Sequence, residues 1–204
     1  MRKIILASVL MLVSFSSAYA LDKGGMFFEP MLTYETTDTG NVNFPAPTGS
    51  SDTTLKGWGT GARFGFHVLD ILFLGADGRY SIPKFKDTTL GQDTDSKSWN
   101  ASALAGVQMP WIVGLRAWGN WIFAGEVDPD NSRNVDEKFK SANGWRLGVG
   151  MKVAVVSLNV EYQDIKYDKT DITSVGVFNT GFSSDGTELH NKAWVFSVSF
   201  PFGL

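Results

Sequence analysis

The sequence predicts an all-β protein: one eight-stranded, antiparallel, up-and-down transmembrane β-barrel. Three observations predict it. Apolar and polar residues alternate with a period of two in eight separate stretches, which is the pattern of strands with two different faces. The connections between the stretches are alternately long and short, and tyrosine or tryptophan recurs at the same end of every stretch. We expect four long outer loops and three short periplasmic turns.

The first twenty residues have the three parts of a secretory signal peptide. Arg2 and Lys3 supply the positive charge, residues 4–13 form the apolar segment, and Ala18 and Ala20 supply the small residues of a cleavage site. A membrane anchor would need about 20 apolar residues, and serines interrupt this run too early. We therefore predict a signal peptide over residues 1–20, cleaved after Ala20, and a single barrel domain over residues 21–204.

The strand predictions follow the alternation along the chain. It is clearest from Trp145 to Val153, where every second residue is apolar and the residues between are glycine, arginine or lysine. The predicted strands are residues 26–35, 58–68, 72–82, 99–109, 113–123, 145–153, 158–163 and 192–202. The predicted long loops are residues 36–57, 83–98, 124–144 and 164–191, and the short turns are residues 69–71, 110–112 and 154–157.

Eight aromatic residues lie at the loop end of these strands, all on the apolar side of the alternation. Aromatic residues favour strands in general, but that preference does not explain their common end and common face. Amphipathic aromatic side chains concentrate at membrane interfaces, where the rings lie at the level of the lipid headgroups. The sequence therefore predicts an aromatic girdle of Tyr34, Trp58, Tyr80, Trp99, Trp121, Trp145, Tyr162 and Trp194.

The apolar face is expected to face lipid rather than the barrel interior. A soluble secreted barrel of the lipocalin type would have the opposite arrangement. Here the polar face contains glycine and charged residues, whereas the apolar face contains almost no charged residue. In a soluble barrel with the apolar face outward, the last strand would also expose an unusually aromatic surface to water. We predict that the polar face lines the lumen with a structural ionic network of Glu29, Arg63, Asp77, Arg79, Arg116, Arg146, Lys152 and Glu161. Glu35 is a further candidate.

Strand pairing around the short turns predicts the neighbours inside the barrel. Aligning the apolar faces places small residues beside long charged ones, and it places Arg63 opposite Asp77, Gly65 opposite Gly75, Gly106 opposite Arg116 and Gly150 opposite Glu161. An eight-stranded barrel is just wide enough for its own side chains to fill. Because isolated buried charges are costly, we expect these charges to pair in a packed plug. A selective pore is the alternative.

The signal peptide, the eight strands and the aromatic carboxyl-terminal strand together resemble the small outer-membrane β-barrel proteins of Gram-negative bacteria, such as the OmpA transmembrane domain and the OmpX and OmpW families. The resemblance implies an outer-membrane location, contact with outer-membrane lipid and lipopolysaccharide, and recognition of the last strand by the barrel-assembly machinery. The matching positions are Trp194, Phe196, Phe200 and Phe202. The chain departs from the usual terminal phenylalanine by ending in Gly203 and Leu204.

Little in the sequence points to chemistry. The absence of cysteine excludes disulfides, thiolate metal sites and a cysteine nucleophile, and a formal charge of −3 argues against nucleic-acid binding. We predict no catalytic, metal or cofactor site. Two alternatives remain open: acyl transfer by His190 with Glu188, Ser183 and Ser184, and weak Ca²⁺ binding by the oxygen-rich stretch 128–137.

The sequence thus favours a non-enzymatic, surface-exposed barrel whose loops carry its specificity, in adhesion or envelope contact, since loops commonly carry function on a rigid scaffold. The surface ligand is not specified by any motif. A narrow channel for small solutes is the second hypothesis, and a lipid A-modifying enzyme is a distant third.

Overall fold

The computed structural model describes residues 25–43, 50–68, 71–87, 92–109, 113–130, 135–175 and 182–204. The predicted signal peptide lies outside the described residues, as do the predicted turn at 110–112 and most of the turn at 69–71. Within the described ranges there is no helix long and apolar enough to span a membrane.

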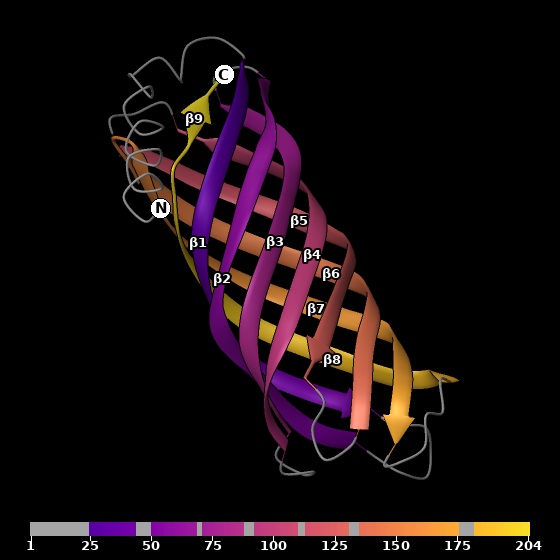
Figure 1. Cartoon of the computed structure of the whole chain (residues 1–204). Coiled ribbons are helices and arrows are strands. Elements are labelled where there is room, and N and C mark those ends of the chain that lie inside the picture. Colours follow the sequence, from indigo (N-terminus) through magenta and orange to yellow (C-terminus); the bar gives the residue numbers. More distant parts are fainter. Residues whose placement is uncertain are drawn as a thin grey trace, which may run out of the picture.

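Eight long antiparallel strands and one short strand make up the described fold (Figure 1). They are β1 (Met26–Asn43), β2 (Ser50–Val68), β3 (Leu72–Asp87), β4 (Gln92–Gln108), β5 (Val113–Pro129), β6 (Val135–Val153), β7 (Val156–Val175), β8 (Phe182–Ser199) and β9 (Phe202–Gly203).

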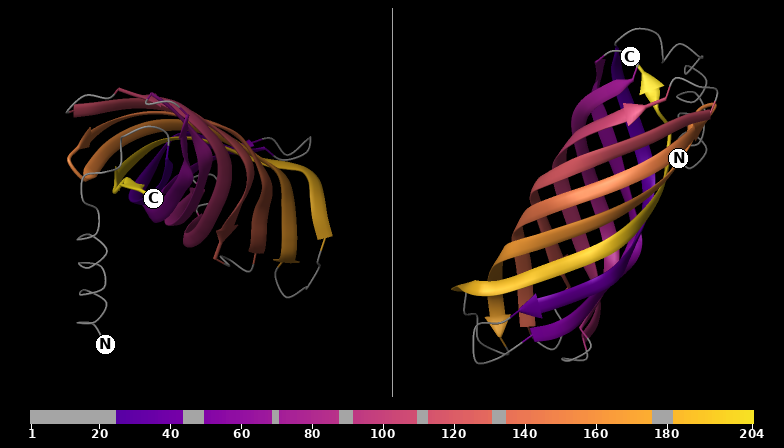
Figure 2. Two further views of the ribbon diagram at one scale, coloured as in Figure 1. Left: turned by 90° about the horizontal axis from the view of Figure 1, so that it is seen from above. Right: turned by 180° about the vertical axis from the view of Figure 1, so that it is seen from behind.

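The sheet closes on itself. Each strand from β1 to β7 pairs with the next one along the chain, and β1 also pairs with β8 and with the short β9. Figure 2, in the view from behind, shows the yellow β8 beside the indigo β1. Following direct cross-strand partners once around the barrel from Met26 leads to Thr36, ten residues farther along β1. This stagger accompanies the strong tilt of the strands against the barrel axis (Figure 1).

The carboxyl-terminal strand is interrupted rather than continuous to residue 202 as predicted. β8 ends at Ser199, and β9 resumes at Phe202 in the same register against β1. The interruption includes Pro201, whose nitrogen has no hydrogen to donate to a neighbouring strand. The backbone N–H of Phe200 still donates to the carbonyl of Pro30 on β1 at 3.0 Å.

The strands are much longer than predicted, and most of the residues assigned to long loops are strand. β1 continues to Asn43 and β2 already begins at Ser50, and the other three long connections are shortened in the same way. β2 extends eight residues beyond Trp58, which is about 26 Å along the strand at roughly 3.3 Å per residue. The barrel therefore continues well past the predicted aromatic girdle.

This extension is possible because the alternation continues with inverted polarity. Beyond the aromatic residues many inward positions become apolar, with serine and threonine among them, and the outward positions become polar or charged. The apolar inward side chains form one buried cluster at the loop end: Val42, Leu55, Phe85, Ile122, Val127, Phe139, Ala142, Ile165, Tyr167 and Leu189. This end of the barrel has the residue pattern of a soluble barrel.

The predicted register is right for one hairpin and wrong for two. Arg63 lies opposite Asp77 and Gly65 opposite Gly75, as expected for β2 and β3. In contrast, β4 and β5 place Trp118, not Arg116, opposite Gly106, and β6 and β7 place Asn159, not Glu161, opposite Gly150. Both errors are shifts of two residues, which keep every side chain on its predicted face.

Candidate functional site: the charged barrel lumen

The middle of the lumen holds most of the charged residues that the alternation places on the inner face. Seven of the eight predicted network residues are buried, and Lys152 is half-buried. Their side chains come from β1, β2, β3, β5, β6 and β7, so the charges meet across the barrel and not only between neighbouring strands.

Asp77, on β3, lies at the centre of this arrangement. Its Oδ2 is 2.9 Å from Nε of Arg63, its cross-strand partner on β2. The Arg79 guanidinium donates to both carboxylate oxygens at 2.9 Å, and Nη1 of Arg146 is 3.5 Å from Oδ1. One buried carboxylate thus faces three guanidinium groups.

Glu161, on β7, accepts from two of these guanidinium groups, those of Arg63 and Arg79, on the far side of the lumen. Its Oε1 is 2.7 Å from Nη2 of Arg63, and its Oε2 is 2.6 Å from Nη1 of Arg79. The indole Nε1 of Trp118 also donates to Oε1, at 2.7 Å. The Arg63 guanidinium lies 4.4 Å from the centre of the Trp118 ring, in cation–π geometry. Charge and aromatic packing are therefore coupled at this point.

Glu29, on β1, collects a second group of donors nearer the turn end. Nη2 of Arg116 is 2.9 Å from each carboxylate oxygen, and Oγ of Ser199 donates at 2.6 Å. Nη1 of Arg63 lies 3.4 Å away and links this group to the carboxylates of Asp77 and Glu161. The buried arginines and acids therefore form one continuous network.

Polar side chains continue the network toward the loop end. Arg146 donates to Oε1 of Gln163 at 3.0 and 3.1 Å and to Oδ1 of Asn100 at 3.0 Å. The Gln163 amide in turn donates to Glu35 at 2.9 Å, as does Asn191. Glu35 thus lies at the edge of the network, held by two amides rather than by an arginine within ion-pair distance.

Lys152 does not join this network. It forms no ion pair with any residue in the part of the chain that the structure describes. Lys152 lies near the turn end of β6 and is half-exposed, so its side chain stays in contact with water, unlike those of the central residues.

Apolar layers lie on both sides of the charges. Toward the turn end, Phe27, Phe73, Leu104 and Trp118 form a buried cluster. Toward the loop end lies the larger cluster that fills the barrel extension.

Burial, with a further contribution from the nearby charge of Asp87, raises the pKa of Glu137 to about 7 at the loop end. Within the described residues, no group of three metal-ligating side chains could hold a metal ion.

Both alternative chemical sites lie partly outside the described residues, and they stay hypotheses. His190 lies on the outer face of the barrel, where its Nε2 is 2.5 Å from Oδ1 of Asp164. The side chains of Ser183 and Ser184 are outside the described residues. In the stretch considered for Ca²⁺, residues 131–134 are outside the described residues, and Asp128 forms an ion pair with Lys138 at 2.9 Å.

The eight predicted girdle residues all lie on the outer face. Six are exposed, and Tyr34 and Tyr162 are half-buried by neighbouring rings. They form four direct cross-strand pairs: Tyr34 with Trp58, Tyr80 with Trp99, Trp121 with Trp145, and Tyr162 with Trp194. From one pair to the next around the barrel, the aromatic position moves along the strands toward the turn end. A ring that is level with the membrane requires this shift, because the strands of the barrel are staggered. Their contact with the lipid headgroups stays a prediction.

Sequence reasoning missed Trp118, the aromatic residue that connects the network to its apolar cap. The sequence did contain a signal for it. Trp118 is two residues from Arg116 on the same strand, so the alternation places both side chains on the inner face. Three glycines on the neighbouring strands also indicated a large side chain here: added Cβ atoms at Gly106, Gly148 and Gly150 would meet Trp118 at 2.7, 2.4 and 3.0 Å.

These features are those of a membrane barrel, and comparison with known families agrees. A model of the outer membrane protein beta-barrel domain matches residues 5–202. The chain belongs to this family. It is thus an outer-membrane β-barrel protein, while cleavage of its first twenty residues stays a prediction. A search of curated protein sequences returns no match.

Among solved structures, three outer-membrane barrels are similar to this chain at low sequence identity, and one of them, OprG, has a TM-score above 0.5. OprG from Pseudomonas aeruginosa has a TM-score of 0.54 at 11% identity, over 88% of this chain and 96% of that chain. Neisserial surface protein A has a TM-score of 0.44 at 16% identity, covering 86% and 98% of the two chains. The outer membrane protease OmpT from Escherichia coli has a TM-score of 0.48 at 9% identity, covering 93% and 100%.

Proposed function

We propose that this protein is a structural and interaction protein of the outer membrane, whose extended loop end makes adhesive or envelope contacts at the cell surface. The lumen serves as a rigid plug and not as a path for solutes. The observation that carries this proposal is the buried ionic network, which crosses the barrel between two apolar layers.

The chemistry of the network supports a closed lumen. Asp77 and Glu161 each bind two or more guanidinium groups, and their side chains are fully buried. A solute could pass only if these ion pairs separated, and breaking a buried pair strands a charge at a cost of about 3–5 kcal/mol. A water-filled channel would instead line its walls with solvated charges.

The outer face of the barrel extension supports a role in surface contact. Its outward residues are mostly charged and exposed, and they extend on strands rather than on loose loops. We infer that this rigid, polar end lies outside the cell and that both termini lie in the periplasm, where the last strand is available to the barrel-assembly machinery.

Recordings from planar lipid bilayers test the closed lumen. We expect the purified, folded protein to add no discrete current steps to the lipid baseline, because the network and both apolar layers block the lumen. A general porin recorded in the same membranes is the positive control. Reproducible single-channel steps from the unchanged protein would favour the narrow channel and contradict the proposal.

A further inference from the structure

The charged side chains of the lumen do not balance. In its middle and turn end the described residues place five cations, namely the four arginines of the network and Lys152, but only four carboxylates: Glu29, Glu35, Asp77 and Glu161. The three carboxylates of the network are ion-paired with arginines. Lys152 has no such partner in the part of the chain that the structure describes. At least one positive charge is therefore uncompensated at the turn end.

A small cavity lies beside Lys152 at the turn end. It has a volume of about 20 Å³, and its lining includes the charged Glu29, Arg116 and Lys152 and the side chains of Gln108 and His67. A cavity needs about 10–15 Å³ to hold one water molecule. This cavity therefore has room for one group of that size or slightly larger.

Gly114 leaves space between the polar groups of this cavity. Gly114, on β5, is the direct cross-strand partner of Lys152 on β6, and Arg116 is that of Gln108 on β4. A Cβ atom added to Gly114 would lie 3.5 Å from Cβ of Lys152 and 4.0 Å from Nε2 of Gln108. Donor-bearing residues from three neighbouring strands therefore surround a position that has no side chain.

Two of these donors lack an acceptor among the described residues. Arg116 is buried, with 5% of its surface exposed, and its Nε has no hydrogen-bond partner there, while its Nη2 binds Glu29. The side-chain amide of Gln108, which is equally buried, also forms no hydrogen bond with a described residue. A buried donor without an acceptor is costly, so an acceptor at this position would stabilise both side chains.

The electrostatic field at the cavity is positive. Arg116 repels Lys152 more strongly than Glu29 attracts it. The Arg116 guanidinium also contacts two aromatic rings, with its carbon 5.2 Å from the centre of the Trp118 ring and 5.8 Å from that of Phe73. Its positive charge is therefore held in place beside the cavity.

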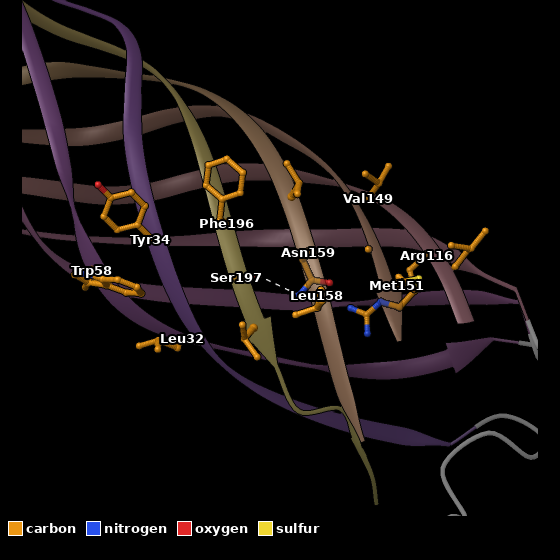
Figure 3. Close-up of a pocket in the computed structure, with 14 residues that line it drawn as sticks. Leu32, Tyr34, Trp58, Arg116, Val149, Met151, Leu158, Asn159, Phe196 and Ser197 are labelled. Atoms are coloured by element: carbon orange, nitrogen blue, oxygen red, sulfur yellow. Dashed lines mark hydrogen bonds between the residues drawn. The ribbon is translucent and has the colours of Figure 1, made fainter. Parts of the chain in front are cut away.

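A larger hollow on the outer face lacks these properties. It has a volume of about 830 Å³, and Figure 3 shows Leu32, Tyr34, Trp58 and Phe196 among the side chains that line it. Arg116 borders this hollow as well, but no second charged residue of the described chain does. The two cations and the small volume needed to hold an anion occur together only in the turn-end cavity, among the described residues.

We propose that Arg116, Lys152 and Gln108 bind a small monovalent anion, of about the size of chloride, at the turn end of the lumen. One negative charge balances the uncompensated cation, and one ion of this size fits the cavity. Phosphate or sulfate would bring more charge and more volume than the site accepts. The inference goes beyond the proposed function, since the anion binds whichever end of the barrel faces the outside.

Chloride-35 NMR of the folded barrel in detergent tests the site, because chloride bound to a protein relaxes much faster than chloride in water. We expect the unchanged protein to give a saturable excess linewidth. Lys152→Met keeps most of the side chain but removes its charge, and it should weaken chloride binding about 10-fold or more. The matched control, Lys169→Met, removes an exposed lysine of β7 that has no ion pair among the described residues, and should bind as the unchanged protein does.

Gly114→Asp tests the position of the anion with a second variant. Its carboxylate would lie beside Lys152 and occupy the cavity, so the saturable linewidth should disappear while the barrel stays at least as resistant to urea. Sulfate at equal ionic strength should not displace chloride from the unchanged protein. The proposal is overturned if the unchanged protein shows no saturable linewidth, if the two lysine variants lose it equally or not at all, if Gly114→Asp still binds chloride, or if sulfate displaces it.

Discussion

Asp77→Ala is expected to lower the free energy of unfolding by about 3–5 kcal/mol, because it leaves buried arginines without a counter-charge. Arg63 and Arg79 keep Glu161, but Arg146 loses the only carboxylate within ion-pair distance in the described residues. The measurement is reversible urea unfolding of the protein folded into lipid vesicles, followed by tryptophan fluorescence.

Two further variants separate the network from a general effect of losing a carboxylate. Asp95→Ala removes an exposed aspartate without an ion pair in the described structure and should change stability by less than about 0.5 kcal/mol. Asp77→Ala combined with Arg63→Ala should cost less than the sum of the two single variants, since both charges of a pair are then absent. Additive losses would show that these two side chains are not coupled.

Gly148→Ala should destabilise the protein by about 1–3 kcal/mol through overpacking. A Cβ atom at this position would lie 2.4 Å from the Trp118 ring and 2.6 Å from its Nε1. The ring would have to move, and the hydrogen bond from Nε1 to Glu161 would lengthen or break. The same vesicle unfolding assay measures the loss, and a changed fluorescence spectrum of the folded protein would report the displaced indole.

Gly78→Ala is the matched control for this substitution. Gly78 is also a strand glycine, but nothing lies within 4 Å of the position that its Cβ would take. We expect a neutral or slightly stabilising effect, because alanine restricts the unfolded chain more than glycine does. If both substitutions cost the same, Trp118 does not pack against Gly148 as described.

Much of the fold follows from local patterns in the sequence. Alternation fixes the face of each residue, which is why the sequence alone places Arg63, Asp77 and Glu161 in the lumen. The observed β2–β3 register, with Val68 opposite Leu72, is the one that the sequence predicts. The other two tested hairpins differ by two residues, since alternation alone cannot distinguish shifts that preserve the faces.

The length of the strands is the larger error of the sequence-based prediction. Segments such as Asp164 to Asp171 are predicted as loops because they are polar, yet Ile165 and Tyr167 alternate with charged residues there. The period of two continues while its polarity inverts, because the outer face passes from lipid to water and the inner face exchanges charges for a buried apolar cluster. The long-range contacts of the lumen, such as Arg63 with Glu161 across the barrel, depend on closure and shear, which single-strand patterns do not encode.

Single-cysteine labelling on intact cells tests the central claim, that the extended loop end faces the outside. The chain has no cysteine, so introduced thiols are the only targets in the protein. Ser50 is exposed at the start of β2, at the loop end, and Val155 is exposed in the turn between β6 and β7. Each is replaced by cysteine in a separate variant. A membrane-impermeant maleimide should label Ser50→Cys on intact cells and Val155→Cys only after the outer membrane is permeabilised. Labelling of Val155→Cys but not Ser50→Cys on intact cells would contradict the account.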